Sequence, residues 1–160
     1  GTGADSDSLG IAFAGDGQFQ DTGSKVIHVA PHTTSTITAK SISQGEGISS
    51  YRGLVKVLPK AFDARVHVQC DALLLNDGAR SDTHPYMDIA NEEVEIGHEA
   101  SVGRIGEEEL FYLMSRGMTE EQARRMIVNG FVEPVIKALP LEYAVELNRL
   151  IELEISDSVT

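Results

Sequence analysis

The spacing of the apolar residues changes once along this chain, near residue 105, and this change constrains the fold more than any other feature. Before it, apolar residues recur at every second position in short runs, separated by turn formers such as Gly15-Asp16-Gly17 and Asn76-Asp77-Gly78. Side chains of a strand point to alternate faces, so each run predicts a strand with one buried face. After residue 105 the apolar residues recur at helical spacing. The sequence therefore predicts a β domain over residues 1–105 and a helical domain over residues 106–160.

The predicted strands are short and no helical pattern lies between them, which favours an all-β sandwich, a barrel or a solenoid. Their apolar residues lie at 9–13, 26–29, 37, 42, 51–58, 66–68, 73–75, 87–89, 94–96 and 102, and residues 21–23 are expected in a turn. Hydroxyl residues crowd positions 33–38, and the run 94–102 alternates with almost no loop. Both features are typical of a parallel β-helix, in which each coil buries its inward residues on the next. Periodicity alone leaves the sandwich and the solenoid about equally supported.

The helical part contains clear start and stop signals. The sequence predicts a first helix that begins after residue 106 and ends at Gly117, because glycine is favoured just beyond a helix C-terminus. Thr119 and Gln122 have the spacing of a capping box, which opens a second helix. We expect this helix to end near Gly130, where a short segment interrupted by Pro134 follows. Pro140 then introduces a last helix.

Charge and composition narrow the possible partners. The net charge is −12, and the acidic excess lies after residue 60. A surface this acidic repels phosphate backbones and anionic lipids, so neither nucleic acid nor a membrane is expected as a partner. No run approaches the roughly 20 apolar residues of a membrane span, and no signal peptide opens the chain. With a single cysteine as well, these features predict a cytoplasmic protein, and the start at Gly1 predicts a piece of a longer chain.

Several blocks of the sequence, in order along nearly the whole chain, resemble the SufB/SufD family of iron–sulfur cluster assembly proteins. The blocks are Val26-Ile27-His28-Val29, Ser41-Ile42-Ser43, Ser50-Tyr51-Arg52-Gly53-Leu54-Val55-Lys56, Gln69-Cys70-Asp71-Ala72-Leu73-Leu74, His84-Pro85-Tyr86, Gly97-His98-Glu99-Ala100, Leu110-Phe111-Tyr112-Leu113-Met114-Ser115-Arg116-Gly117, Met126-Ile127-Val128-Asn129-Gly130-Phe131 and Pro140-Leu141-Glu142-Tyr143-Ala144. Family members are longer, so the chain is similar to their C-terminal portion. The cysteine block and the His-Glu-Ala block resemble the SufB branch more than the SufD branch.

This resemblance implies a right-handed parallel β-helix followed by a small helical lobe. It implies a non-enzymatic scaffold of the SUF system, which holds a transient, labile iron–sulfur cluster. The implied partners are SufD or a second SufB, paired through the β-helix, and the SufC ATPase, docked on the helical lobe. Sulfur-donor proteins and apo-proteins that accept clusters are implied as further partners.

Cys70 matches the cysteine that the family uses for cluster assembly. Thiolate is a preferred ligand of iron in clusters, and this is the only thiol of the chain. We expect Cys70 at the end of one strand, before a new strand begins. Strand alternation places it on the same face as the apolar Val66 and Val68, so the thiol must lie at an interface or an opening to meet iron. A cluster needs about four ligands, so the other ligands must come from elsewhere.

His98 and Glu99 are the other predicted iron ligands, since they match a His-Glu pair of the family. Adjacent residues of a regular strand point to opposite faces, so both reach one site only through a bulge, and otherwise serve two sites. His84 is a weaker candidate, in an extended segment before Pro85. Gly97 departs from the acid that the family often has there, which puts any role for paired carboxylates in doubt.

For the helical lobe, we expect the SufC contact to draw on Phe111, Tyr112, Arg116, Met126 and Phe131, some of which also form the lobe's core. Two other functions stay open. A β-helix polysaccharide hydrolase or lyase is disfavoured by an aromatic content of 6% without tryptophan. A plain assembly module, in which the β-helix is a spacer, fits the same sequence.

Overall fold

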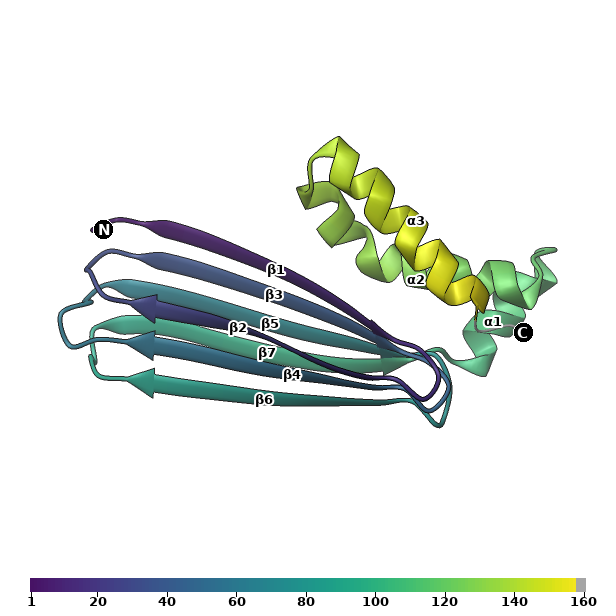
Figure 1. Ribbon diagram of the computed structural model, residues 1–160, viewed down its shortest axis with the longest axis horizontal. Helices are drawn as coiled ribbons and strands as arrows, with labels where there is room; N and C mark the ends of the chain where they lie inside the picture. The colour runs from purple at the N-terminus through teal and green to yellow at the C-terminus, as the bar shows by residue number, and fades with distance from the viewer. Residues whose placement is uncertain (158–160) are drawn as a thin grey trace.

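The computed structural model describes residues 1–157 and consists of seven strands followed by three helices (Figure 1). The strands are β1 (Asp5–Ala14), β2 (Phe19–His28), β3 (Thr34–Ser43), β4 (Ile48–Val57), β5 (Ala64–Leu74), β6 (Arg80–Ile89) and β7 (Val94–Arg104). The helices are α1 (Glu107–Ser115), α2 (Glu120–Ala138) and α3 (Leu141–Asp157). Residues 158–160 of the predicted helical domain lie outside the described residues.

The strands wind into a parallel β-solenoid of about three turns. One sheet has the order β1-β3-β5-β7 and the other the order β2-β4-β6, and every pairing is parallel. Each strand therefore pairs with the strand one coil later, as Asp5 does with Thr34. A sandwich is built from antiparallel sheets, so the predicted solenoid is confirmed and the sandwich is excluded.

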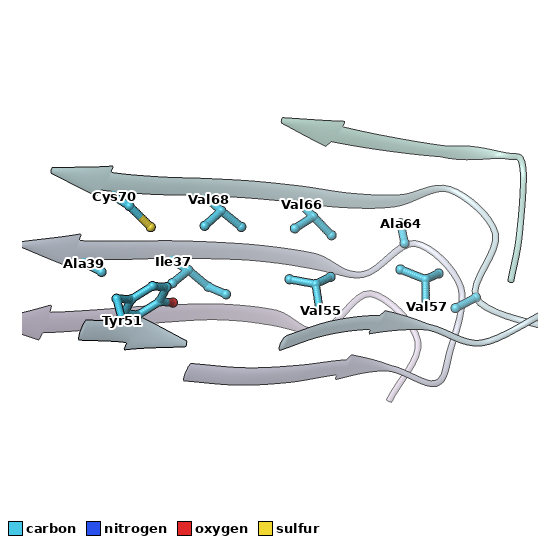
Figure 2. Packing of buried hydrophobic residues seen from close by; sticks show 10 residues of the cluster. Ile37, Ala39, Tyr51, Val55, Val57, Ala64, Val66, Val68 and Cys70 are labelled. Atoms are coloured by element: carbon cyan, nitrogen blue, oxygen red, sulfur yellow. The ribbon is translucent and has the colours of Figure 1, made fainter. Parts of the chain in front are cut away.

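The space between the two sheets holds the first hydrophobic core (Figure 2). Alternate residues of β5 point inward, and Val66 and Val68 are each only 3% exposed. They meet inward residues of the neighbouring coil and of the opposite sheet, including Ile37 and Val55. The alternation that the sequence shows is thus the alternation between the interior and the outer surface of the solenoid.

A second core joins the helices to the outer face of the β1-β3-β5-β7 sheet. Ile42 and Leu73 project from that face and pack with Val128 and Val132 of α2, which are fully buried. The Arg124 Nη1 atom also donates a hydrogen bond of 2.7 Å to the carbonyl oxygen of Leu75. The helices therefore cover the end of the sheet at which its strands lead toward α1 (Figure 1).

The helix start and stop signals are partly confirmed. Gly117 follows α1 with a φ of 93°, which glycine adopts without strain. Thr119 and Gln122 form the predicted capping box. The predicted end near Gly130 is wrong, because α2 continues through Pro134 to Ala138. Its buried face also continues past the proline, and this packing outweighs the lost hydrogen bond.

The turn predicted at residues 21–23 is also wrong, because these residues lie within β2. Gly23 is needed there for a different reason. A Cβ atom at this position would collide with the carbonyl oxygen of Arg52 on the next coil.

Among the helices described for residues 1–157, we find none that combines the length and the apolar character of a membrane span.

Ile37 and Ile27 allow a test of the solenoid core, because the first is 1% exposed in the interior and the second is 43% exposed on the outer surface. We expect Ile37→Ala to lower the free energy of unfolding by about 2–5 kcal/mol, since it leaves a cavity. Ile27→Ala should change it by about 0.5 kcal/mol or less. Urea unfolding followed by circular dichroism measures both, and equal losses would contradict the assignment of the core.

Candidate functional site

Cys70 lies inside the solenoid. It occupies the middle of β5 rather than a strand end, so the predicted strand boundary at this residue is wrong. Its neighbours along the ladder are Ala39 on the preceding coil and Ala100 on the following one. The side chain points into the interior core beside Val68, as the alternation predicted, and the residue is 4% exposed (Figure 2).

A small cavity of about 50 Å³ adjoins the thiol. Its walls come from both sheets and carry hydroxyl groups, among them those of Thr22, Ser24 and Tyr51. Burial, and to a lesser degree the neighbouring Asp71 carboxylate, raises the pKa of the Cys70 thiol to about 11. The sulfur is therefore protonated at neutral pH, and it must lose its proton before it can bind iron.

Asp71, the next residue, points to the opposite face of β5 and joins a polar network there. Its carboxylate accepts hydrogen bonds from Ser101 Oγ at 2.6 Å and from Gln69 Nε2 at 2.9 Å. It also pairs with Lys40 Nζ at 3.0 Å, with side-chain exposures of only 9% for Lys40 and 14% for Asp71. Burial raises the pKa of Asp71, but the hydrogen bonds from Ser101 and Lys40 outweigh it, so the net shift is downward.

This network also reaches the helices. The Nζ atom of Lys40 lies 4.4 Å from the centre of the Phe131 ring of α2. The coil that carries the thiol is thus linked to α2 through Asp71 and Lys40. The sequence alone did not predict this role for Asp71 and Lys40. Asp71 directly follows the cysteine, and Lys40 is recognisable as its partner only once the length of one coil is known.

His98 and Glu99 lie on β7, the last strand of their sheet. His98 pairs with Val68 and therefore faces the interior, whereas Glu99 pairs with Gln69 and faces outward. The pairing runs without interruption from Val94 to Arg104, so no bulge brings the two side chains together. The His98 Nε2 atom is buried, and no group within residues 1–157 forms a hydrogen bond with it.

His84 lies apart from these residues. It sits on β6 in the other sheet, paired with Arg52, and it is exposed. The structure therefore places Cys70 and His98 on the same interior face of neighbouring strands, Glu99 on the outer face, and His84 on a different sheet. In the part of the chain that the structure describes, no three His, Cys, Asp or Glu side chains gather into a metal site.

Aromatic and apolar side chains stand out from the helices. Phe111 is 74% exposed, Tyr112 is 57% exposed and Met126 is 50% exposed. Arg116 donates a hydrogen bond of 3.0 Å to Tyr112 Oη, and its guanidinium group lies 5.1 Å from the centre of that ring. Phe131 differs from these four, because it is half-buried and packs against the second core.

Comparison with known proteins reveals close similarity to one family. Residues 1–131 match the family described as "SUF system FeS cluster assembly, SufBD core domain". A Mycobacterium bovis protein named as an iron–sulfur cluster assembly SufBD family protein is 56% identical over 151 residues, which cover 94% of this chain and 18% of that relative. A Staphylococcus aureus protein with the same family name is 53% identical over 159 residues, covering 99% of this chain and 34% of that relative. The chain thus spans between about a fifth and a third of the length of these relatives.

The buried thiol predicts a distinct pH profile for alkylation of Cys70 by iodoacetamide. Because only the thiolate reacts, and the pKa is raised to about 11, the rate in the folded protein should still rise about tenfold per pH unit at pH ~10. The same chain unfolded in urea should level off near the ordinary thiol pKa of about 8.5. Mass spectrometry of the alkylated fraction gives both rates. A plateau below pH ~9 in the folded protein would contradict the buried, protonated state.

Proposed function

The chain belongs to the SufBD family of the SUF system for iron–sulfur cluster assembly, and from this premise we propose that it is part of a scaffold on which clusters are built. Its role is to bind and to present, without catalysing a reaction of its own. Iron and sulfide are cargo in this proposal, because the scaffold holds a cluster only until an acceptor apo-protein takes it.

The observation that carries the proposal is the position of the single thiol. Cys70 faces the interior on β5, one strand before the last strand of the sheet, and His98 faces the same interior from that last strand. A thiol and an imidazole are suitable iron ligands, but two are fewer than the roughly four that a cluster requires. One chain therefore supplies only part of the ligand set, as expected for a cluster that is shared between two subunits.

The missing ligands would come from a second subunit. Within the described chain, β6 and β7 each pair on one side only, so their outer edges can extend the sheets with strands of a partner. We propose SufD, or a second copy of SufB, as this partner. Glu99 projects outward from β7, where it can serve iron on the outer surface of the same strand, and His84 is the weakest of the four candidates because it lies on the other sheet.

We assign the chain to the SufB branch rather than to SufD. Support comes from the Gln69-Cys70-Asp71 block and from the His98-Glu99-Ala100 block, which supply the thiol and the imidazole–carboxylate pair. The sulfur would reach Cys70 from a sulfur-donor protein, and the assembled cluster would leave to apo-proteins.

The protonated thiol has a mechanistic consequence. Iron displaces the proton of a thiol when it binds, so the affinity of Cys70 for iron depends on pH and on how well the proton can leave. A pKa of about 11 weakens iron binding to the isolated chain, and docking of a partner or displacement of β7 would strengthen it. Such a site holds its cluster weakly, which suits a protein that transfers the cluster onward.

Residues 106–160 form the proposed docking lobe for the SufC ATPase. Phe111, Tyr112 and Met126 expose large apolar surfaces. The acids Glu107 and Glu108 line a surface pocket together with Phe111. Exposed aromatic side chains and arginine are the residue types that dominate binding energy at interfaces. Phe131 supports this surface from below rather than forming part of it, since it packs on the second core.

Anaerobic reconstitution with iron and sulfide, in the presence of the partner subunit, tests the cluster site. We expect wild-type protein to develop a visible charge-transfer band, and Cys70→Ser to lose at least about nine-tenths of it, because the thiolate ligand is removed. His32→Ala is the control, because His32 is an exposed histidine on a distant turn, paired with Asp63. A band of equal intensity in Cys70→Ser contradicts the assignment, and the absence of any band with SufC binding intact leaves the spacer function.

Capture of SufC tests the docking lobe. We expect Tyr112→Ala and Arg116→Ala each to weaken SufC binding about tenfold, because the stacked pair is lost from the contact surface. Tyr86→Ala is the matched control, since Tyr86 is 64% exposed on the solenoid, away from the helices. Calorimetric titration measures the affinities, and unchanged binding in both lobe variants would remove this pair from the contact.

A further inference from the structure

Tyr51 lines the same cavity as Cys70, from the opposite sheet. It is 8% exposed, and its ring belongs to the interior core together with Cys70 (Figure 2). Its hydroxyl oxygen is fully buried, yet no group in residues 1–157 meets hydrogen-bond geometry with it. A buried hydroxyl without a partner costs about 1–3 kcal/mol, so its presence here calls for an explanation.

The surroundings of Tyr51 fix the direction in which its hydroxyl points. Gly53 lies two residues on, and a Cβ atom at this glycine would lie 3.0 Å from the Tyr51 ring and 3.3 Å from its hydroxyl oxygen. The ring therefore rests against the bare backbone of Gly53. Burial raises the pKa of Tyr51, and the Ser24 hydroxyl on the neighbouring strand β2 acts weakly in the opposite direction, but the two hydroxyl groups do not meet hydrogen-bond geometry. Ser24 is instead paired with Ser8 at 3.3 Å.

Space beside the thiol arises from the small residues of its ladder. Gly10, Ala39, Cys70 and Ala100 follow one another across the four strands of the sheet, so nothing larger than a methyl group flanks the sulfur on this ladder. The resulting cavity of about 50 Å³ has room for one or two non-hydrogen atoms and is too small for a cluster. Cys70 and Tyr51 both line this cavity, and no hydrogen bond joins the sulfur to the Tyr51 hydroxyl.

A second sulfur atom bonded to Cys70 would extend into this space, because a sulfur–sulfur bond is about 2.05 Å long. The hydroxyl-rich wall suits such an atom, since an anionic terminal sulfur accepts hydrogen bonds. The inward-facing polar side chains of this wall, such as Thr22, Ser24 and Tyr51, carry hydroxyl groups, whereas the lining residue Asp71 turns its carboxylate to the outer face of β5.

We propose that Tyr51 is a positioning residue, whose hydroxyl donates a hydrogen bond to a single sulfur atom carried by Cys70 as a persulfide. This inference rests on the proposed function, in which Cys70 takes part in cluster assembly. It assigns the interior cavity to this sulfur atom at a stage before iron binds, and it leaves Cys70 and His98 as iron ligands of the proposed function.

The loading step balances with an inorganic disulfide ion as the sulfur donor. The Cys70 sulfur attacks one sulfur of HS–S⁻, the bond within the donor breaks, and a new bond forms between Cys70 and that sulfur. The thiol proton leaves on the other sulfur, so Cys70–SH and HS–S⁻ give Cys70–S–S⁻ and H₂S. The sulfur transferred keeps its oxidation state, and no external oxidant is consumed.

The experiment loads the whole protein with inorganic polysulfide, removes the excess, and follows the bound sulfur over time by intact mass. Because Cys70 is the only cysteine, a mass increase of one sulfur reports on this residue alone. We expect Tyr51→Phe, which keeps the ring and removes the hydroxyl, to lose the sulfur about tenfold faster than wild type. Tyr86→Phe is the matched control on an exposed tyrosine and should behave as wild type, and Cys70→Ser gives the baseline.

Raman spectroscopy supplies a readout that altered packing alone would not move. The loaded protein has a single sulfur–sulfur stretching band, since it has one cysteine, and this band should shift in Tyr51→Phe and stay in place in Tyr86→Phe. An unchanged band together with unchanged sulfur loss in Tyr51→Phe overturns the role of Tyr51. If wild type binds no sulfur but still forms a Cys70-dependent cluster band, the cavity holds water only, and the inference fails while the proposed function stands. If it forms neither, both fail.

Discussion

The structure depends on the parallel in-register ladder, in which each residue of a coil lies directly on a residue of the coil before it. The pairing of β3, β5 and β7 runs without a bulge, so every side chain is assigned either to the interior or to the outer surface. A strand alternates these two environments residue by residue. Neighbours in sequence, such as Cys70 and Asp71, therefore belong to different chemical surroundings.

This separation decides how the chemistry is distributed. On the inner side of β5, burial keeps the Cys70 thiol protonated beside a small hydroxyl-lined cavity. On the outer side, hydrogen bonds keep Asp71 ionised and tie it to Lys40, which lies against the Phe131 ring of α2. Because both sides share one strand, a displacement of α2 that moves Lys40 would act on the coil that carries the thiol. The helices are thus connected to the interior of the solenoid through Lys40 and Asp71, although the two hydrophobic cores are separate.

Sequence alone predicted the features that depend on local rules. The inward direction of Cys70, the opposite faces of residues 98 and 99, and the capping box of Thr119 follow from strand alternation and helix geometry within a few residues. The features it missed depend on packing between distant segments. The continuation of α2 through Pro134 rests on contacts with the sheet, and the strand conformation of Gly23 rests on the approach of Arg52 from the next coil. The sequence does not indicate a role for Tyr51, because its position opposite Cys70 follows only from knowing which strands form which sheet.

The burial of Cys70 is easier to understand for a scaffold than for an enzyme. An enzyme that uses a thiol needs it ionised and accessible at working pH, and its surroundings lower the pKa accordingly. Here the surroundings act in the opposite direction, and the residue is covered by the following strand of the ladder. A thiol held in this state is protected from stray metals and oxidants until the end of the solenoid is engaged. In the proposed function, a change at β7 or at the partner surface would uncover the thiol, so assembly would control its reactivity. That control is consistent with the proposed role, in which binding of the next subunit, rather than chemistry within this chain, starts cluster formation.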